Sequence, residues 1–155
     1  MTGVQTCALP ISVPPLDYAT HADALLKELA ALPQSGGIDT EILVARTKAV
    51  RDRAVALSAR ATTATPTQIA SINRALIAVS RALVPVDYTT GDRFMPDPAT
   101  PQPPWPSLDA MRRLGSLDPV SDPGKFATVS ARRARNRMAH ALAQAITALD
   151  IGLTA

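Results

Sequence analysis

Apolar residues recur along most of the chain at the three- and four-residue steps of an α-helix, in stretches separated by turn-forming residues. These stretches predict main helices over about residues 18–32, 40–62, 66–83 and 123–149, and a short helix over 108–114. The pattern predicts an all-α fold, an antiparallel helical bundle. The expected core positions are Ala22, Leu25, Leu26, Leu29, Leu32, Leu43, Thr47, Val50, Ala54, Leu57, Ala61, Ile69, Ile72, Leu76, Val79, Leu83, Leu108, Met111, Leu114, Ala127, Ala131, Ala134, Met138, Ala141, Ala145 and Leu149.

The third predicted helix has the clearest boundaries. Thr65 is placed to cap it, Pro66 occupies the first helical position, and Gln68 completes a capping-box pattern. Val84 and Pro85 are expected to end it, because a proline inside a helix removes a backbone hydrogen bond and crowds the preceding turn.

A proline-rich loop is predicted over residues 85–106. It holds seven of the 14 prolines, and three of the five aromatic residues: Tyr88, Phe94 and Trp105. Loops of this length are uncommon in compact domains and are usually functional or disordered. The aromatic residues favour a functional loop, because disordered segments are poor in them.

Residues 1–12 read like the translation of a common sequencing adapter. We interpret them as an artefact of metagenomic assembly and expect the gene to be a fragment. Residues 13–155 then form a single domain. The only cysteine, Cys7, lies inside the adapter-like stretch, so the remaining chain offers neither a disulfide nor a thiolate.

Charge and hydropathy indicate neither nucleic acid nor membrane as a partner. The net charge is only +3, and no apolar run approaches the roughly 18 residues of a membrane span. At about 100° per residue, Arg133 and Arg137 lie on one flank of the last helix's apolar stripe. Arg135 lies on the other flank and Arg132 opposite the stripe, whereas a groove-reading helix gathers its cations on one face.

We expect these arginines to be solvated or paired with acidic neighbours such as Asp23, Glu28, Glu41 and Asp52. A basic helical module that binds nucleic acid is the alternative function, and it predicts binding that weakens steeply with salt.

Few residues are candidates for chemistry. His21 and His140 are the only histidines, and neither has a second ligand at a zinc-binding spacing. We interpret both as hydrogen-bonded helix histidines. Asp87, Asp92 and Asp97 share the proline-rich loop, where turn and capping roles account for them. The residues therefore predict no catalytic site, no metal site and no cofactor within this chain.

Several motifs resemble the transferrin-receptor-like dimerisation domain, which ends the zinc peptidases related to glutamate carboxypeptidase (prostate-specific membrane antigen). The order and spacing of the motifs carry the resemblance, which covers nearly all of residues 13–155. The matching segments are Pro15-Leu16-Asp17-Tyr18, Ile72-Asn73-Arg74-Ala75-Leu76, Ser80-Arg81-Ala82-Leu83, Trp105-Pro106-Ser107-Leu108-Asp109-Ala110-Met111 and Arg135-Asn136-Arg137-Met138-Ala139-His140-Ala141-Leu142.

The resemblance implies a non-catalytic C-terminal domain of a bacterial zinc amino- or carboxypeptidase, often exported, that pairs subunits and walls the active-site cleft. Its partners would be a second subunit and the missing catalytic domain, which holds the family's zinc, two ions in such enzymes. Loop residues Arg93, Phe94 and Trp105 would reach the cleft, although residues 91–98 lack the family's tyrosine-rich pattern. The residues of the family motifs given a structural role are Asn73, Arg74, Arg81, Asn136, Arg137 and His140.

Overall fold

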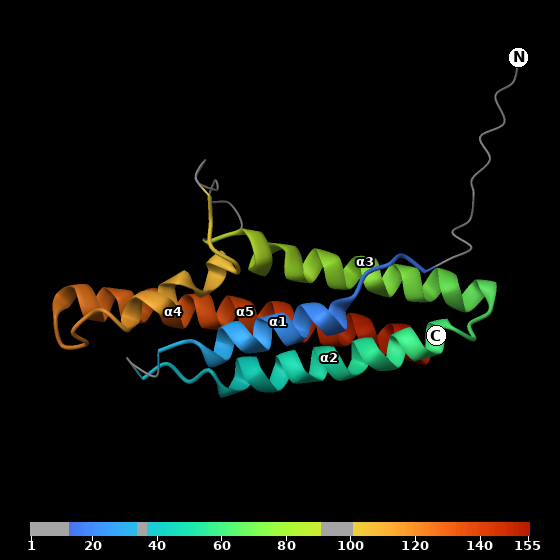
Figure 1. The fold of residues 1–155 in the computed structure, drawn as a ribbon, viewed down its shortest axis with the longest axis horizontal. Coiled ribbons are helices and arrows are strands. Elements are labelled where there is room, and N and C mark those ends of the chain that lie inside the picture. Colours follow the sequence, from blue (N-terminus) through green and yellow to red (C-terminus); the bar gives the residue numbers. More distant parts are fainter. Residues whose placement is uncertain (1–12, 34–36, 91–100) are drawn as a thin grey trace, which may run out of the picture.

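The computed structural model describes residues 13–33, 37–90 and 101–155, which contain helices and no strand (Figure 1). The predicted all-α class is confirmed. The adapter-like stretch 1–12 and most of the proline-rich loop, residues 91–100, lie outside the described residues. The elements are α1 (Tyr18–Ala30), α2 (Glu41–Ala61), α3 (Pro66–Tyr88), the 3-10 turn η1 (Pro106–Leu108), α4 (Asp109–Leu114) and α5 (Asp122–Thr154).

The longest helix, α5, is the axis of the bundle. Both α2 and α3 pack lengthwise against it, and α4 and η1 cover its first half (Figure 1). Helix α1 packs on α2 and lies across the core from α5, while α2 and α3 barely contact each other. Because α1 has 13 residues and α2 has 21, α1 spans only part of the bundle's length.

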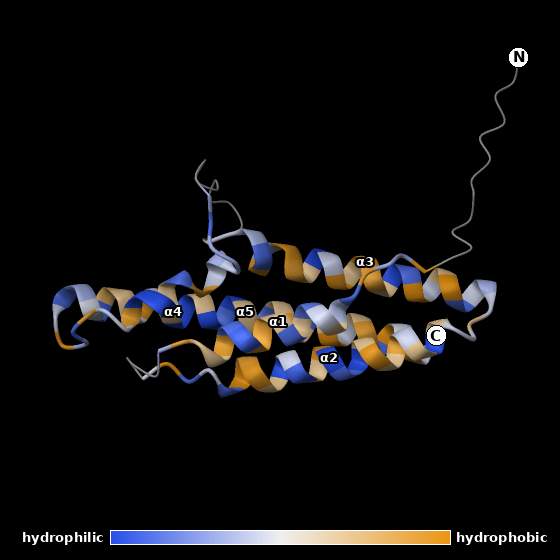
Figure 2. Cartoon of the chain, viewed as in Figure 1, coloured by the Kyte–Doolittle hydropathy of each residue, from blue (hydrophilic) through white to orange (hydrophobic). Residues whose placement is uncertain are grey.

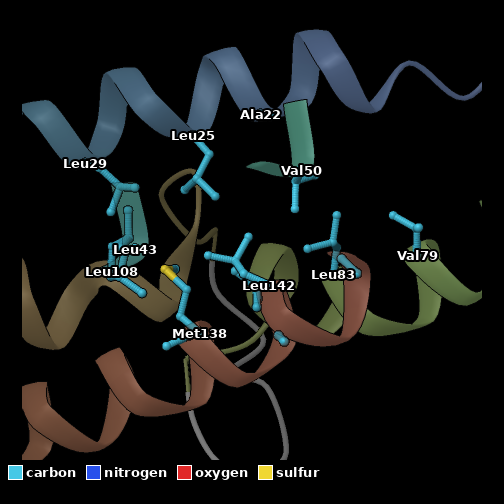
Figure 3. Packing of buried hydrophobic residues seen from close by; sticks show 14 of the residues in the cluster. Ala22, Leu25, Leu29, Leu43, Val50, Val79, Leu83, Leu108, Met138 and Leu142 are labelled. Carbon is cyan, nitrogen blue, oxygen red and sulfur yellow. The ribbon is translucent and has the colours of Figure 1, made fainter. Parts of the chain in front are cut away.

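The core lies where α1, α2, α3 and α5 face one another. Leu25 and Leu29 of α1 point toward Met138 and Leu142 of α5, with Leu108 beside them (Figure 3). The sequence pattern identified this core correctly, since nearly every expected position is buried. The exceptions, which are only partly buried, are Leu26, Ala61, Ile69 and Ala127.

The predicted capping box is present at the start of α3. The Gln68 backbone N–H donates to Thr65 Oγ1 over 3.4 Å, and the Thr65 N–H donates to Gln68 Oε1 over 2.9 Å. Two backbone donors that a helix start leaves without partners are thereby satisfied.

The expected end of α3 at Val84–Pro85 is wrong, because the helix continues through Pro85 to Tyr88. Pro85 is exposed, so the carbonyl that loses its helical donor faces the solvent side. Burial of Val86, which is 4% exposed, favours continuing the helix. The Thr89 hydroxyl then satisfies the Pro85 carbonyl over 2.6 Å. The last helix is also longer than the pattern indicated, since α5 runs to Thr154.

Helix α3 is rich in apolar residues along its length (Figure 2). By length and hydropathy alone it could cross a membrane, but 44% of its most apolar window is buried inside the bundle. The same helix carries Arg74 and Arg81 on its surface. A core helix of a bundle can be as long and as apolar as a membrane-spanning helix, and these observations fit a core helix.

Helix α5 approaches α3 and α2 closely at Gly152, and a larger residue there should destabilise the protein. A Cβ at Gly152 would lie 2.8 Å from the Ala75 Cβ and 3.1 Å from a methyl of Leu57. Gly152→Val should therefore destabilise the protein by about 1–3 kcal/mol, because Ala75 cannot move without its helix. Urea denaturation measures the loss. Gln144→Val, at an exposed position of the same helix, is the control and should stay within about 0.5 kcal/mol.

Candidate functional site

The two ends of the proline-rich segment meet at one end of the bundle. Its start is the last turn of α3, and its end is η1, which packs against α3 and α5. The Ser107 hydroxyl donates to the Val86 carbonyl over 2.7 Å and so joins the two ends directly. Around this junction lie Tyr18, His21, Asp87, Trp105 and Arg112, which we call the Trp105 cluster.

His21 and Asp87 link α1 to the last turn of α3. The His21 Nε2 lies 3.0 and 3.1 Å from the two carboxylate oxygens of Asp87. The two side chains are only 24% and 17% exposed. The Trp105 indole packs edge-on against the imidazole, with ring centroids 5.8 Å apart, and Tyr18 packs on it at 6.3 Å. The extra turn of α3 beyond Pro85 is what carries Asp87 to this position.

Arg112 of α4 holds the other side of the cluster. One guanidinium nitrogen donates to Asp109 Oδ1 over 2.8 Å and to the Trp105 carbonyl over 3.2 Å. The other donates to Glu28 Oε2 over 2.7 Å and to the Pro104 carbonyl over 2.8 Å. One side chain therefore ties α1, α4 and the end of the proline-rich segment together. A planar guanidinium suits this role because its donors point in fixed, divergent directions.

Trp105 has a left-handed backbone, with φ of 47°. Side-chain-bearing residues rarely adopt this conformation, and it persists where surrounding contacts enforce it. Here Arg112 and the Leu108 N–H both bond to the Trp105 carbonyl. The buried indole N–H has no hydrogen-bond partner among the described residues. The strained turn fixes the point at which the proline-rich segment rejoins the bundle.

Tyr18 is the first residue of α1 and completes the cluster. Its hydroxyl donates to the Leu76 carbonyl of α3 over 3.2 Å. Burial raises the pKa of the Tyr18 phenol, a hydrogen bond to Ser80 partly offsets the rise, and the nearby charge of Asp87 adds to it. A neutral Tyr18 therefore forms part of the link between α1 and α3.

The cluster has the form of a structural joint. Among the described residues, no hydroxyl or thiol bonds to His21, so its pairing with Asp87 activates no nucleophile there. The described ranges also contain no group of three or more side chains suited to a metal ion. The loop aspartates Asp92 and Asp97 lie outside these ranges, and Asp87 belongs to α3.

Within the described ranges, the site residues expected from the family resemblance fall in three places. Trp105 is in the cluster, and Arg93 and Phe94 lie outside the described residues. Asn73 is buried in α3, 5% exposed. The remaining motif residues lie on the outer surface of α3 and α5 rather than beside Trp105: Arg74, Arg81, Asn136, Arg137 and His140.

Of the two alternatives expected for the basic run, solvation fits the described residues and pairing with the acidic neighbours does not. Asp23 and Asp52 both pair with Arg51, and Glu28 pairs with Arg112. These carboxylates lie on α1 and α2, where closer arginines reach them. Three arginines of the basic run are exposed, as expected for solvated side chains: Arg132, Arg133 and Arg137. The fourth, Arg135, is partly buried.

Sequence reasoning missed the central contacts of this site. His21 is hydrogen-bonded, as expected. Its bond to Asp87 and the bond of Arg112 to Glu28 connect residues far apart in the chain, which spacing along the sequence does not reveal.

Comparisons with protein-family models, curated proteins and solved structures found no match to this chain.

Arg112→Ala should destabilise the protein by about 1–3 kcal/mol, because it removes bonds to two carboxylates and two carbonyls. The emission of Trp105, the only tryptophan, should shift to longer wavelength as the segment loosens. Arg113→Ala is the matched control, since that exposed side chain bonds only to its own helix. Equal unfolding midpoints for the two variants would contradict this account of the site.

Tyr18 should make stability depend on alkaline pH. Its pKa is raised in the folded state, so its contribution is complete below the unfolded pKa of about 10 and is lost as pH rises through the folded pKa. Tyr18→Phe should flatten this alkaline loss in urea denaturation. Tyr88→Phe, at a position 67% exposed, should leave it intact. An unchanged slope in Tyr18→Phe would show that burial of Tyr18 does not couple to folding.

Proposed function

We propose that this chain is a non-catalytic C-terminal dimerisation domain of a bacterial zinc metallopeptidase, which pairs subunits and walls the active-site cleft. The catalytic zinc would belong to a separate domain of the same protein. The observation that carries the proposal is an apolar groove of about 900 Å³ on the bundle surface. Its apolar lining suits the insertion of apolar side chains from a second copy of the chain, as in the packed core of protein interfaces.

The groove arises from the arrangement of the helices. It lies between the second half of α2 and the first half of α3, where α1 is too short to cover them, and residues 13–17 border it. Leu57, Ile72 and Leu76 contribute apolar side chains to the lining. At the rim, Val55 is 50% exposed and Leu16 is 44% exposed. This surface suits protein association rather than catalysis, because it offers few polar groups.

The Trp105 cluster supports the second part of the proposed role. It anchors both ends of the proline-rich segment at one end of the bundle, through Ser107 on one side and Arg112 on the other. A segment anchored in this way can form one wall of a cleft whose reactive groups lie on another domain. The order of the family motifs along the chain points to the same role.

Sedimentation equilibrium of the purified chain tests pairing. We expect about twice the monomer mass. Val55→Asp should raise the dissociation constant of the dimer by about tenfold or more, because burying a carboxylate in an apolar interface costs free energy. Val120→Asp is the matched control, at a position 75% exposed and away from the groove. A monomer at all concentrations, or peptidase turnover by the chain alone, would overturn the proposal.

A further inference from the structure

A second groove, of about 530 Å³, runs between α3 and α5. Its lining includes the small side chains of Ala75, Ala78 and Ala148, with Arg74, Gln144 and Ile151 beside them. The small side chains keep it shallow and apolar. This groove lies on α3 and α5, whereas the groove proposed to pair subunits lies between α2 and α3.

The surface around this groove continues along both helices, which run antiparallel (Figure 1). Seven residues are about two helical turns, so Arg81 follows Arg74 on the same side of α3. On α5, Arg137 follows Gln144 for the same reason, and Arg133 lies one turn further. All five of these side chains are exposed. We call this surface the α3/α5 face.

Among the described residues, the α3/α5 face carries arginines and no acidic side chain. The carboxyl oxygen of Ala155, which lines the groove, accepts a hydrogen bond from Arg60. The only carboxylate of α3 is Asp87, which is paired with His21. Those of α5 are Asp122 and Asp150, which pair with Lys125 and Arg53. Within the described ranges, Arg81, Arg133 and Arg137 therefore have no ion-pair partner and no hydrogen bond from the side chain. Arginines left without partners on one face are available to bind an anionic group.

Large apolar side chains are interspersed with these arginines. Ile77 is 46% exposed, Val84 45%, Tyr88 67% and Ile151 61%. A mixture rich in arginine, aliphatic and aromatic residues and poor in lysine and acids is typical of protein interfaces. Nucleic acid supplies phosphates but no side chain to fill the groove or cover Ile77 and Val84. The composition therefore favours a polypeptide partner.

The same charges exclude a second copy of this face as the partner. In a two-fold symmetric dimer each surface meets itself, so arginines would face arginines with no acidic side chain between them. We propose that the α3/α5 face docks an acidic amphipathic polypeptide segment. Its carboxylates pair with Arg74, Arg81 and Arg137, and its aliphatic side chains enter the alanine-lined groove. Pairing of subunits uses the α2/α3 groove instead, so either proposal can fail alone.

A labelled synthetic helical peptide with leucines on one side and glutamates on the other serves as the probe. Fluorescence anisotropy follows its binding to the whole chain at about 0.15 M salt. We expect the double variant Arg81→Glu/Arg137→Glu to weaken binding by about tenfold or more. Lys27→Glu/Lys48→Glu is the control, because it makes the same change of charge at exposed sites of α1 and α2, and it should change affinity by less than about twofold.

Four comparisons decide the partner's chemistry. A peptide with glutamine in place of glutamate, or with serine in place of leucine, should bind at least about tenfold more weakly, because each lacks one half of the recognition. Equal binding of either one overturns the proposal. Tighter binding of duplex DNA or of phosphatidylserine vesicles overturns it in favour of a nucleic acid or a membrane.

Sedimentation separates this inference from the pairing proposal. Arg81→Glu/Arg137→Glu should leave the mass of the chain unchanged, whether that mass is monomeric or dimeric. A loss of mass in this variant would show that the α3/α5 face mediates self-association, and it would overturn the docking proposal. Thermal unfolding of both double variants checks that each remains folded.

Discussion

The close packing of α5 against α2 and α3 is the constraint on which the rest of the structure depends. The buried stripe of α5 consists largely of alanines and ends at Gly152, so the neighbouring helices approach it closely. Larger side chains in α1 and α3, such as Leu25 and Leu83, then fill the remaining space. Helix α1 packs on α2 across the core from α5, and its limited length leaves the α2/α3 groove open.

The Trp105 cluster follows from the same arrangement. Because α1 does not pack closely on α3, the two helices are joined by long polar side chains, through His21–Asp87 and Tyr18. Arg112 performs the corresponding task between α1 and α4. Ion pairs on a surface contribute little, but partly buried groups that each make several bonds contribute more. The cluster therefore fixes the end of the bundle from which the proline-rich segment extends.

The sequence predicted the elements and the core well, because helical periodicity and caps are local properties. The stripe through Leu43, Val50 and Leu57 and the capping box at Thr65 were visible from spacing alone. The end of α3 was misplaced at Pro85, because the burial of Val86 outweighed the tendency of proline to end a helix. Spacing alone did not decide between solvation and pairing for the basic run, because the partners of Asp23 and Glu28 depend on which helices become neighbours. The same dependence concealed the Trp105 cluster and the α3/α5 face, which no single segment encodes.

The order of the helices along the chain also affects how the protein is made. During synthesis, α1, α2 and α3 leave the ribosome before the helix against which two of them pack. A helix without its packing partner is marginal in water, and domains generally fold as units. Most of the apolar surface of α2 and α3 must therefore remain exposed to water and chaperones until α5 emerges, and the bundle then forms as one unit.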